Sequence, residues 1–213
     1  MFAKVSPLQL FQTPVFAQDL PEGVRATLEP GLRQALAVLP AGPPGSPALW
    51  RSHHDLHRRP PFRPLAELLL ETAHRILVQL KSEQQAPAIT ALWATREPPG
   101  AALPPELHRN AYLGGLYLLE GEAGQVTFLD PRPQAHLIAG PVSQPTPATQ
   151  AEATLPLRPG RLLLWPAWLW HHTQPNPGPG QRTLLHVSLS FQDYTRAMSP
   201  PRWTGMTPPE PQP

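Results

Sequence analysis

The 213-residue sequence contains no cysteine, and this absence excludes thiolate zinc sites, iron–sulfur clusters and disulfide bonds. Lysine is nearly absent too, standing only at Lys4 and Lys81, and the net charge is +2 with the arginines scattered along the chain. We therefore expect no nucleic-acid partner. No apolar run approaches the length of a membrane span, and the N-terminus lacks the apolar core of a signal peptide. These absences predict a cytoplasmic protein without membrane contact.

Proline is abundant, with 33 residues, which favours strands, turns and loops over long helices. The length suits a single domain with a sizeable core, and we assign residues 1–198 to it. The remaining segment, 199–213, is rich in proline and is interpreted as a disordered tail. A small molecule and a peptide both stay open as substrates, and the oligomeric state stays open as well.

The order of the predicted elements defines the fold class. Apolar residues at three- and four-residue steps predict a helix over Phe62–Leu80, and Glu22–Leu39 is also helix-like. An apolar segment at residues 8–16 is a candidate edge strand, and residues 141–154 read as a long polar loop. Period-two or continuous apolar runs predict five strands, at residues 89–95, 112–119, 125–129, 162–165 and 183–191. Helices first and strands afterwards favour a mainly β α+β fold, a double-stranded β-helix (jelly roll) with N-terminal helices packed on it.

The stretch 161–191 carries the strongest chemical signal. A predicted strand leads through a Pro-Ala-Trp corner to His171, and Arg182 opens the next strand. An imidazole can ligate a metal, and a guanidinium can hold a carboxylate placed beside it. Arg182 enters a strand of otherwise apolar residues, so it needs a buried anion to be tolerated there. A ligand carboxylate bound in bidentate fashion would supply that anion.

The segment that enters the strand at residue 112 offers the other half of a metal site. A facial iron site needs two neutral imidazoles and one carboxylate, and His108 is the natural partner of His171. Two carboxylates stay open. Glu106 shares a strand face with His108, and Asp130 follows the strand 125–129. Asp130 is explained equally well as the turn residue of Asp-Pro-Arg, and the more usual position for an aspartate holds Asn110.

The other histidines have weaker claims. His53, His54 and His57 form a cluster, but nothing places them on one face of a regular element, and neighbouring arginines would repel a cation. We interpret the cluster as structural or exposed. His186 lies on the strand face of Arg182, so it either lines the pocket or packs in the core.

Taken together, the residues resemble a family of 2-oxoglutarate- and iron(II)-dependent oxygenases of bacteria and phages, nearly end to end. The family opens with LF-x-TP-V, contains H-x-H-P, SGVYYL and DPR in its centre, and closes with FPSWL-x-H-x-V-x-PN and R-x-S-I-S-F. The matching positions of this chain, in order, are Leu10, Phe11, Thr13, Pro14, Val15, Trp50, Ser52, Trp93, His108, Gly115, Tyr117, Asp130, Pro131, Arg132, Pro166, Trp168, Leu169, His171, Pro175, Asn176, Arg182 and Phe191.

The resemblance implies a double-stranded β-helix that uses Fe(II) and 2-oxoglutarate, whose oxidative decarboxylation is coupled to hydroxylation of an unidentified substrate. Carried over by position, His171 is the distal iron ligand and Arg182 anchors the 2-oxoglutarate carboxylate. Thr95 and Tyr117 are assigned to cosubstrate binding by the same resemblance.

One departure from the family pattern keeps alternatives open. His108 matches the second histidine of H-x-H, whereas Glu106 stands in place of the first. The chain has therefore exchanged that ligand for a carboxylate, completed the site with Asp130, or lost the metal. A catalytically degenerate binding or accessory module without iron is one alternative function. A cupin-like metal enzyme that does not use 2-oxoglutarate is another.

Overall fold

The computed structural model describes residues 8, 10–40, 49–83, 85–132 and 140–193. Its strands and helices, in chain order, are β1 (Phe16–Asp19), α1 (Glu22–Ala37), β2 (Trp50–Arg51), the 3-10 turns η1 (Leu56–Arg58) and η2 (Pro60–Phe62), α2 (Arg63–Gln79), β3 (Pro87–Glu97), β4 (Leu113–Glu120), β5 (Gly124–Leu129), β6 (Glu152–Leu157), β7 (Arg161–Pro166), β8 (His171–Thr173) and β9 (Arg182–Phe191). Both predicted helices and all the predicted strands from residue 89 onwards are present. The tail assigned to residues 199–213 lies outside the described residues.

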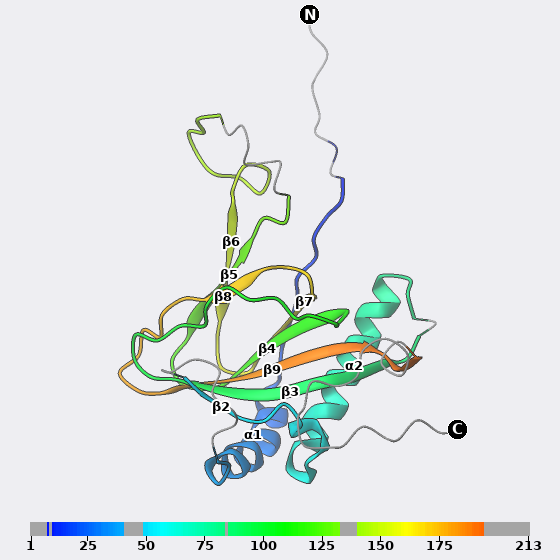
Figure 1. The fold of residues 1–213 in the computed structure, drawn as a ribbon, viewed down its shortest axis with the longest axis vertical. Helices are drawn as coiled ribbons and strands as arrows, with labels where there is room; N and C mark the ends of the chain where they lie inside the picture. The colour runs from blue at the N-terminus through cyan, green and yellow to red at the C-terminus, as the bar shows by residue number, and fades with distance from the viewer. Residues whose placement is uncertain (1–7, 9, 41–48, 84, 133–139, 194–213) are drawn as a thin grey trace, which may run out of the picture.

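The strands form two antiparallel sheets. The larger sheet has the order β1-β7-β4-β9-β3-β2, and the smaller one has the order β6-β5-β8. Helices α1 and α2 lie on one side of the larger sheet, and the smaller sheet lies on the other (Figure 1). The predicted mainly β α+β fold with a double-sheet core and N-terminal helices is confirmed.

Period-two alternation along β9 divides the core into two layers. Leu185, Val187 and Leu189 pack in the apolar cluster that includes the buried faces of both helices. Leu184 belongs to the second cluster, which fills the space between the two sheets together with Trp165 and residues of β5. Because successive side chains of a strand point to opposite faces, the even-numbered residues of β9 share the side of Leu184. This inter-sheet side is where the candidate site lies.

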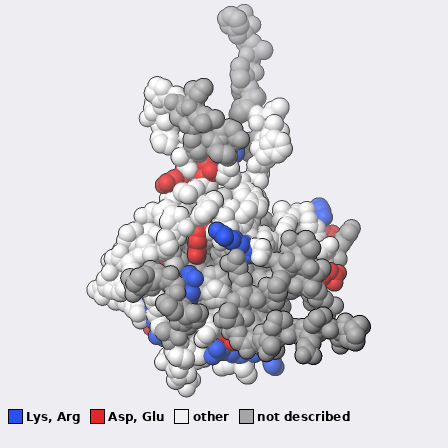
Figure 2. Space-filling view, viewed as in Figure 1, with Lys and Arg blue, Asp and Glu red and all other residues white. Residues whose placement is uncertain are grey.

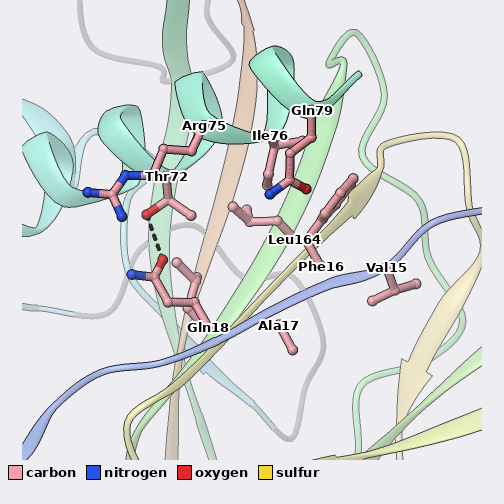
Figure 3. Close-up of a pocket in the computed structure, with 10 residues that line it drawn as sticks. Val15, Phe16, Ala17, Gln18, Thr72, Arg75, Ile76, Gln79 and Leu164 are labelled. Carbon is pink, nitrogen blue, oxygen red and sulfur yellow. Dashed lines mark hydrogen bonds between the residues drawn. The ribbon is translucent and has the colours of Figure 1, made fainter. Parts of the chain in front are cut away.

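Buried polar contacts join the helices to the larger sheet. Glu29 of α1 is 3 % exposed and accepts a hydrogen bond of 2.6 Å from the hydroxyl of Tyr117 in β4. Arg25 and Arg33 flank the same carboxylate at 2.9 and 2.6 Å. Thr72 of α2 donates to Gln18 of β1 at 2.8 Å, at the edge of a surface pocket (Figure 3). The helices are thus held in position by specific contacts in addition to their apolar faces.

Three strand expectations need correction. The first strand is Phe16–Asp19, at the far end of the segment 8–16, because only there does the chain pair with β7. The expected loop 141–154 ends earlier, since β6 begins at Glu152 and pairs with β5. His171 itself lies in a three-residue strand, β8, which the sequence analysis did not predict.

Basic and acidic side chains are interspersed on the face of the molecule shown in Figure 2. Within the described part of the chain, no helix is both long enough and apolar enough to cross a membrane.

Candidate metal centre

Three side chains converge at one end of the space between the sheets. Each of Glu106, His108 and His171 offers one ligand atom, and these atoms all lie within 4.8 Å of one another. Among the described residues this is the group of histidine and carboxylate side chains close enough to share an ion. The group contains two imidazoles and one carboxylate, which is the donor set of non-haem Fe(II) oxygenases.

The backbone brings the three ligands together. The segment around Glu106 pairs with β8 through two hydrogen bonds between Glu106 and His171, of 2.9 and 3.0 Å. The amide of His108 donates to Ala167 O at 3.0 Å, so the segment runs extended beside the strand that carries His171. Residues two apart on extended chain share a face, and Glu106 and His108 therefore point to the same side as His171.

Each imidazole is oriented by a hydrogen bond on its far nitrogen. Nδ1 of His171 faces the carbonyl of Leu169 at 3.2 Å, and since a carbonyl only accepts, Nδ1 carries the proton. Nδ1 of His108 pairs with the hydroxyl of Ser188 at 2.9 Å. In both residues Nε2 is the nitrogen left free, and this arrangement is typical of histidines that ligate a metal.

Burial keeps both imidazoles neutral. It lowers the pKa of His108 to about 3, with a further contribution from the neighbouring imidazole of His171. Burial likewise lowers the pKa of His171 to about 4. At neutral pH both imidazoles are therefore uncharged, and a neutral imidazole that carries its proton on Nδ1 presents a lone pair at Nε2, which is the form that binds a metal.

The three ligand atoms also lack any partner within the described structure. Nε2 of His108, Nε2 of His171 and Oε1 of Glu106 are buried and make no hydrogen bond. Buried polar atoms without partners cost free energy and are uncommon in native proteins. Three of them facing one point fit a bound cation, which would satisfy all three at once. The residues present thus fit an Fe(II) ion, with Glu106, His108 and His171 as its ligands.

The charge around Glu106 is balanced by one arginine. Arg51 NH2 lies 3.7 Å from Glu106 Oε2, which is an ion pair too long to be a hydrogen bond. Burial raises the pKa of Glu106, and the positive charge of Arg51 offsets part of that increase. A metal beside Oε1 would favour the ionised carboxylate still further.

Aromatic rings pack around the two imidazoles of the group. Trp165 lies edge-on to His171, with ring centroids 4.6 Å apart, and Trp93 is tilted against His108 at 5.5 Å. Phe128 lies 6.1 Å from His171. Gly114 leaves room for these rings, because a Cβ there would lie 2.8 Å from the ring of His108. The imidazoles therefore lie in a tightly packed recess, while the side chain of Glu106 is 25 % exposed.

Asp130, the other carboxylate that the sequence left open, does not join this group. Its side chain accepts hydrogen bonds from the backbone and the guanidinium of Arg132, at 2.8–3.0 Å. This is the Asp-Pro-Arg turn arrangement that competed with a ligand role in the sequence analysis. Of the two carboxylates, the structure brings Glu106 to the imidazoles.

Arg182 lies on the inter-sheet side of β9, as predicted, but the protein itself supplies its anion. The guanidinium is fully buried and pairs with the fully buried carboxylate of Glu97, directly across from it on β3. It also donates to Gln174 O at 2.7 Å, and Thr173 donates to the second oxygen of Glu97 at 3.1 Å. The sequence argument that Arg182 needs a buried anion holds. The anion is a side chain in this structure.

The two other positions assigned to the cosubstrate have different outcomes. Thr95 is buried on the inter-sheet side of β3 and bonds Nε2 of His186 at 2.9 Å. Tyr117 faces the helices, where its hydroxyl donates to Glu29, so its assignment to the cosubstrate site is corrected. The reason is strand parity: Tyr117 is one residue away from Leu116, which faces the space between the sheets.

The histidine cluster of residues 53–57 forms no metal site in the described structure. His54 stacks on Trp93, with ring centroids 4.6 Å apart. His57 is half-buried, and burial lowers its pKa to about 4. The ring of His186 also stacks on Trp93, with ring centroids 4.9 Å apart, and His186 is fully buried. The two roles that the sequence left open, lining the site and packing in the core, are therefore compatible.

Sequence reasoning missed several residues that shape the site. Ser188 hydrogen-bonds His108, and Gly114 leaves room for the ring of His108. A single serine or glycine in an apolar strand gives no sequence signal for either role. Arg51 was considered only as a repulsive charge, although it lies beside the carboxylate ligand. Glu97 ends β3, two residues beyond the predicted strand 89–95, and would have been found only through the strand register that places it opposite Arg182.

Comparison with known proteins defines the class. Residues 91–192, which contain Glu106, His108, His171 and Arg182, match the family model described as "Putative 2OG-Fe(II) oxygenase". This match confirms the resemblance stated from the motifs. No curated protein sequence matches the chain.

Solved structures show the same fold at low sequence identity. The chain is similar to the non-heme alpha ketoglutarate dependent epimerase SnoN from nogalamycin biosynthesis, with a TM-score of 0.61, 18 % identity, and 92 % of this chain and 86 % of that one covered. HygX from Streptomyces hygroscopicus, with nickel, 2-oxoglutarate and hygromycin B bound, matches with a TM-score of 0.57, 18 % identity and 84 % of both chains covered. A Pseudomonas putida prolyl-4-hydroxylase matches with a TM-score of 0.59 and 13 % identity, covering 84 % of this chain and 94 % of that one.

Proposed function

We propose that this protein is a mononuclear Fe(II) oxygenase of the 2-oxoglutarate-dependent type, with Glu106, His108 and His171 as the iron ligands. The observation that carries the proposal is the convergence of three buried, unpartnered ligand atoms from those residues. Glu106, two residues before His108, stands where the family pattern has its first histidine. Exchange of that ligand for a carboxylate is therefore favoured over loss of the metal.

Each residue of the site has a defined task. Leu169 O and Ser188 Oγ hold the two imidazoles so that both Nε2 atoms face inwards. Glu106 supplies the negative charge, and the positive charge of Arg51 offsets part of the rise that burial causes in the pKa of that carboxyl group. When bound with 2-oxoglutarate and dioxygen, Fe(II) supplies the oxidising power that hydroxylates a C–H bond, and succinate and carbon dioxide are released.

The aromatic wall has its own role in this chemistry. Trp165 and Trp93 pack against the ligand rings and exclude water from their inner sides. Exclusion of water from the imidazole side of the ion would protect reactive species there from side reactions. These contacts are all within the protein, so they do not indicate which class of substrate the site would bind.

Metal uptake tests the ligand set directly. Purified protein is titrated anaerobically with Fe(II), and separately with Co(II), whose visible spectrum reports ligand number. We expect one ion per wild-type chain, and at least a hundredfold weaker binding in Glu106→Ala and His171→Ala. Asp130→Ala is the matched control and should bind as wild type does. Uptake that survives Glu106→Ala but is lost in Asp130→Ala would show that the ligand set is wrong.

A metal enzyme that does not use 2-oxoglutarate is the second candidate, and one observation favours it. The arginine expected to anchor the cosubstrate already pairs with Glu97. The visible absorption of the Fe(II) protein distinguishes the two functions. A band that develops only when 2-oxoglutarate is added, together with succinate formation in air, supports the first candidate. Metal uptake without any response to 2-oxoglutarate supports the second.

A further inference from the structure

The guanidinium of Arg182 uses only part of its hydrogen-bond donors within the protein. Nε and Nη2 both contact one carboxylate oxygen of Glu97, Oε2, and Nη2 also donates to Gln174 O at 2.7 Å. Nη1 is buried and has no hydrogen-bond partner among the described residues. A buried donor without an acceptor costs free energy, so the third nitrogen of the guanidinium is a position at which a ligand oxygen would be stabilised.

This unpartnered nitrogen faces a glycine on the opposite sheet. A Cβ on Gly124, the first residue of β5, would clash with Nη1 of Arg182. Since β9 belongs to the larger sheet and β5 to the smaller one, Nη1 points into the space between them. Gly124 and Phe128 share one face of β5, and the ring centroids of Phe128 and His171 are 6.1 Å apart. The same wall of the inter-sheet space therefore leads from the candidate metal centre to Nη1.

Glu97 changes the charge that a ligand meets at this position. The side chains of Arg182 and Glu97 are both completely buried, and their charges cancel. An arginine without such a partner would attract a ligand carboxylate with its full charge. Beside the balanced pair, the same carboxylate creates a net negative charge, and like charges repel strongly where water is excluded. Glu97 and a ligand carboxylate therefore compete for one guanidinium.

The contact between Glu97 and Arg182 does not fully offset the cost of burying the carboxylate. Burial raises the pKa of Glu97, and the positive charge of Arg182 offsets only part of that rise, together with hydrogen bonds from Arg182 and Thr173. Buried ion pairs often contribute little net stability, although removal of one partner is costly. A second anion at Nη1 is therefore able to bind, at an affinity lowered by the repulsion from Glu97.

We propose that Glu97 is an internal competitor for Arg182 and sets the affinity of this site for the distal carboxylate of 2-oxoglutarate. Arg182 receives that carboxylate at Nη1, and Glu97 acts on the ligand through Arg182. The inference rests on the proposed function, since it requires a 2-oxo acid at the ion held by Glu106, His108 and His171. Its consequence is weak selection for a distal carboxylate in the wild type, which becomes strong when the charge of Glu97 is removed.

Anaerobic calorimetry of the Fe(II)-loaded protein tests this with two probes. 2-Oxoglutarate and 2-oxobutyrate share the 2-oxo acid group, but only the former has a distal carboxylate. Fe(II) affinity is measured first and separately, so failure of the metal site is seen before any 2-oxo acid is added. The variants are Glu97→Gln, which removes the charge at nearly constant size, and the double variant with Arg182→Gln. Glu67→Gln, the same change at an exposed position of α2, is the matched control.

The expected result is a gain of discrimination. Wild type and Glu67→Gln should bind 2-oxoglutarate no more than about threefold more tightly than 2-oxobutyrate, because repulsion from Glu97 offsets the contact at Nη1. Glu97→Gln should bind 2-oxoglutarate at least tenfold more tightly than wild type does, with an unchanged affinity for 2-oxobutyrate, since a charge-assisted hydrogen bond is worth about that factor or more. The double variant should bind both acids within about twofold of each other, because the guanidinium is gone.

Thermal unfolding of the same Fe(II)-loaded samples gives a second readout. Glu97→Gln leaves the charge of Arg182 buried without a partner, so its Tm should be lower than that of wild type. Addition of 2-oxoglutarate should raise the Tm of Glu97→Gln by more than it raises that of wild type, and 2-oxobutyrate should not. A merely structural pair would show the lower Tm without this selective recovery.

Two results would overturn the inference. A wild-type preference for 2-oxoglutarate of about tenfold or more would show that Glu97 does not compete, and this measurement requires no variant to fold. An unchanged ratio of the two affinities in Glu97→Gln would show that the pair serves only the fold. Absence of Fe(II) uptake in the wild type would instead refute the proposed function, and the inference with it.

Discussion

Replacing Gly114 by alanine should disrupt the metal centre through a single methyl group. An ideal Cβ at this position would lie 2.8 Å from both Cγ and Cδ2 of His108, and 3.1 Å from Nε1 of Trp165. Favourable contacts between carbon atoms lie at roughly 3.5–4.0 Å, so the rings must retreat by about 1 Å. The backbone of Gly114 is not among those with positive φ, so alanine meets no backbone strain there. The effect therefore measures the packing around His108 alone.

The size of the effect follows from how tightly both rings are held. His108 is 5 % exposed and fixed by Ser188, and Trp165 is fully buried, so neither side chain can move into solvent. Overpacking of such a core position costs about 1–3 kcal/mol. For a chain of this size we expect a Tm lower by roughly 3–10 °C. Because His108 supplies a ligand, Fe(II) affinity should fall by about 10- to 100-fold, as it does when the support of a metal-bound histidine is lost.

Thermal unfolding and anaerobic Fe(II) titration of the same variant check both parts. Gly31→Ala is the control, because Gly31 lies in α1 and a Cβ there meets nothing within 4 Å. That change should stabilise the helix by about 0.5–1 kcal/mol and leave metal binding unchanged. If Gly114→Ala binds Fe(II) as tightly as wild type, then either His108 is not a ligand or the recess is looser than the structure shows, and the reasoning fails.

Three further changes separate the ligands from their surroundings. Ser188→Ala should weaken Fe(II) binding about tenfold, with little loss of Tm, because it removes the hydrogen bond that orients His108. Ser188→Thr keeps the hydroxyl and should recover part of the lost Fe(II) affinity in the same titration. Tyr117→Phe should destabilise the fold by about 1–3 kcal/mol in denaturant unfolding and leave Fe(II) affinity unchanged, because its hydroxyl donates to Glu29 of α1. A selective loss of Fe(II) or 2-oxoglutarate binding would contradict the position of Tyr117 against the helices. The pKa values of about 3 for His108 and about 4 for His171 lie below the unfolded value, so both contribute stability above pH 6.5 that is lost as pH falls through the window from 6.5 to those values. Unfolding of the metal-free protein followed from pH 8 to pH 4 should show this loss, which His171→Phe should reduce.

Residue periodicity predicted most of the longer elements, although the six-residue strand β6 was missed and partly assigned to a loop. The stripe of Leu65, Leu69 and Ala73 identifies α2. Along β9, alternate residues from Leu185 to Leu189 pack in one apolar cluster, and Leu184 packs in the other. Strands of two or three residues show no period, and for this reason β2 and β8 were missed. Their existence depends on pairing with β3 and β5, residues distant in the sequence.

The candidate site shows the same limit at the level of single residues. Period two was enough to predict that Glu106 and His108 share a face, because both lie in one short extended segment. The choice between Glu106 and Asp130 was not accessible in this way, since both are acidic residues next to predicted strands. It depends on the pairing of Glu106 with His171, a contact between segments 65 residues apart in numbering. Arg132, two residues after Asp130, was the local signal that a turn would use that carboxylate.

Arg182 shows how a physical argument from local sequence can miss a partner that the fold supplies. A buried guanidinium requires an anion, and with only local sequence in view the ligand was the available candidate. The antiparallel pairing of β3 with β9 places Glu97 opposite Arg182, and this register is a property of the whole sheet. Two carboxylates thus distinguish this chain: Glu106 lies beside the two imidazoles of the candidate metal centre, and Glu97 pairs with Arg182.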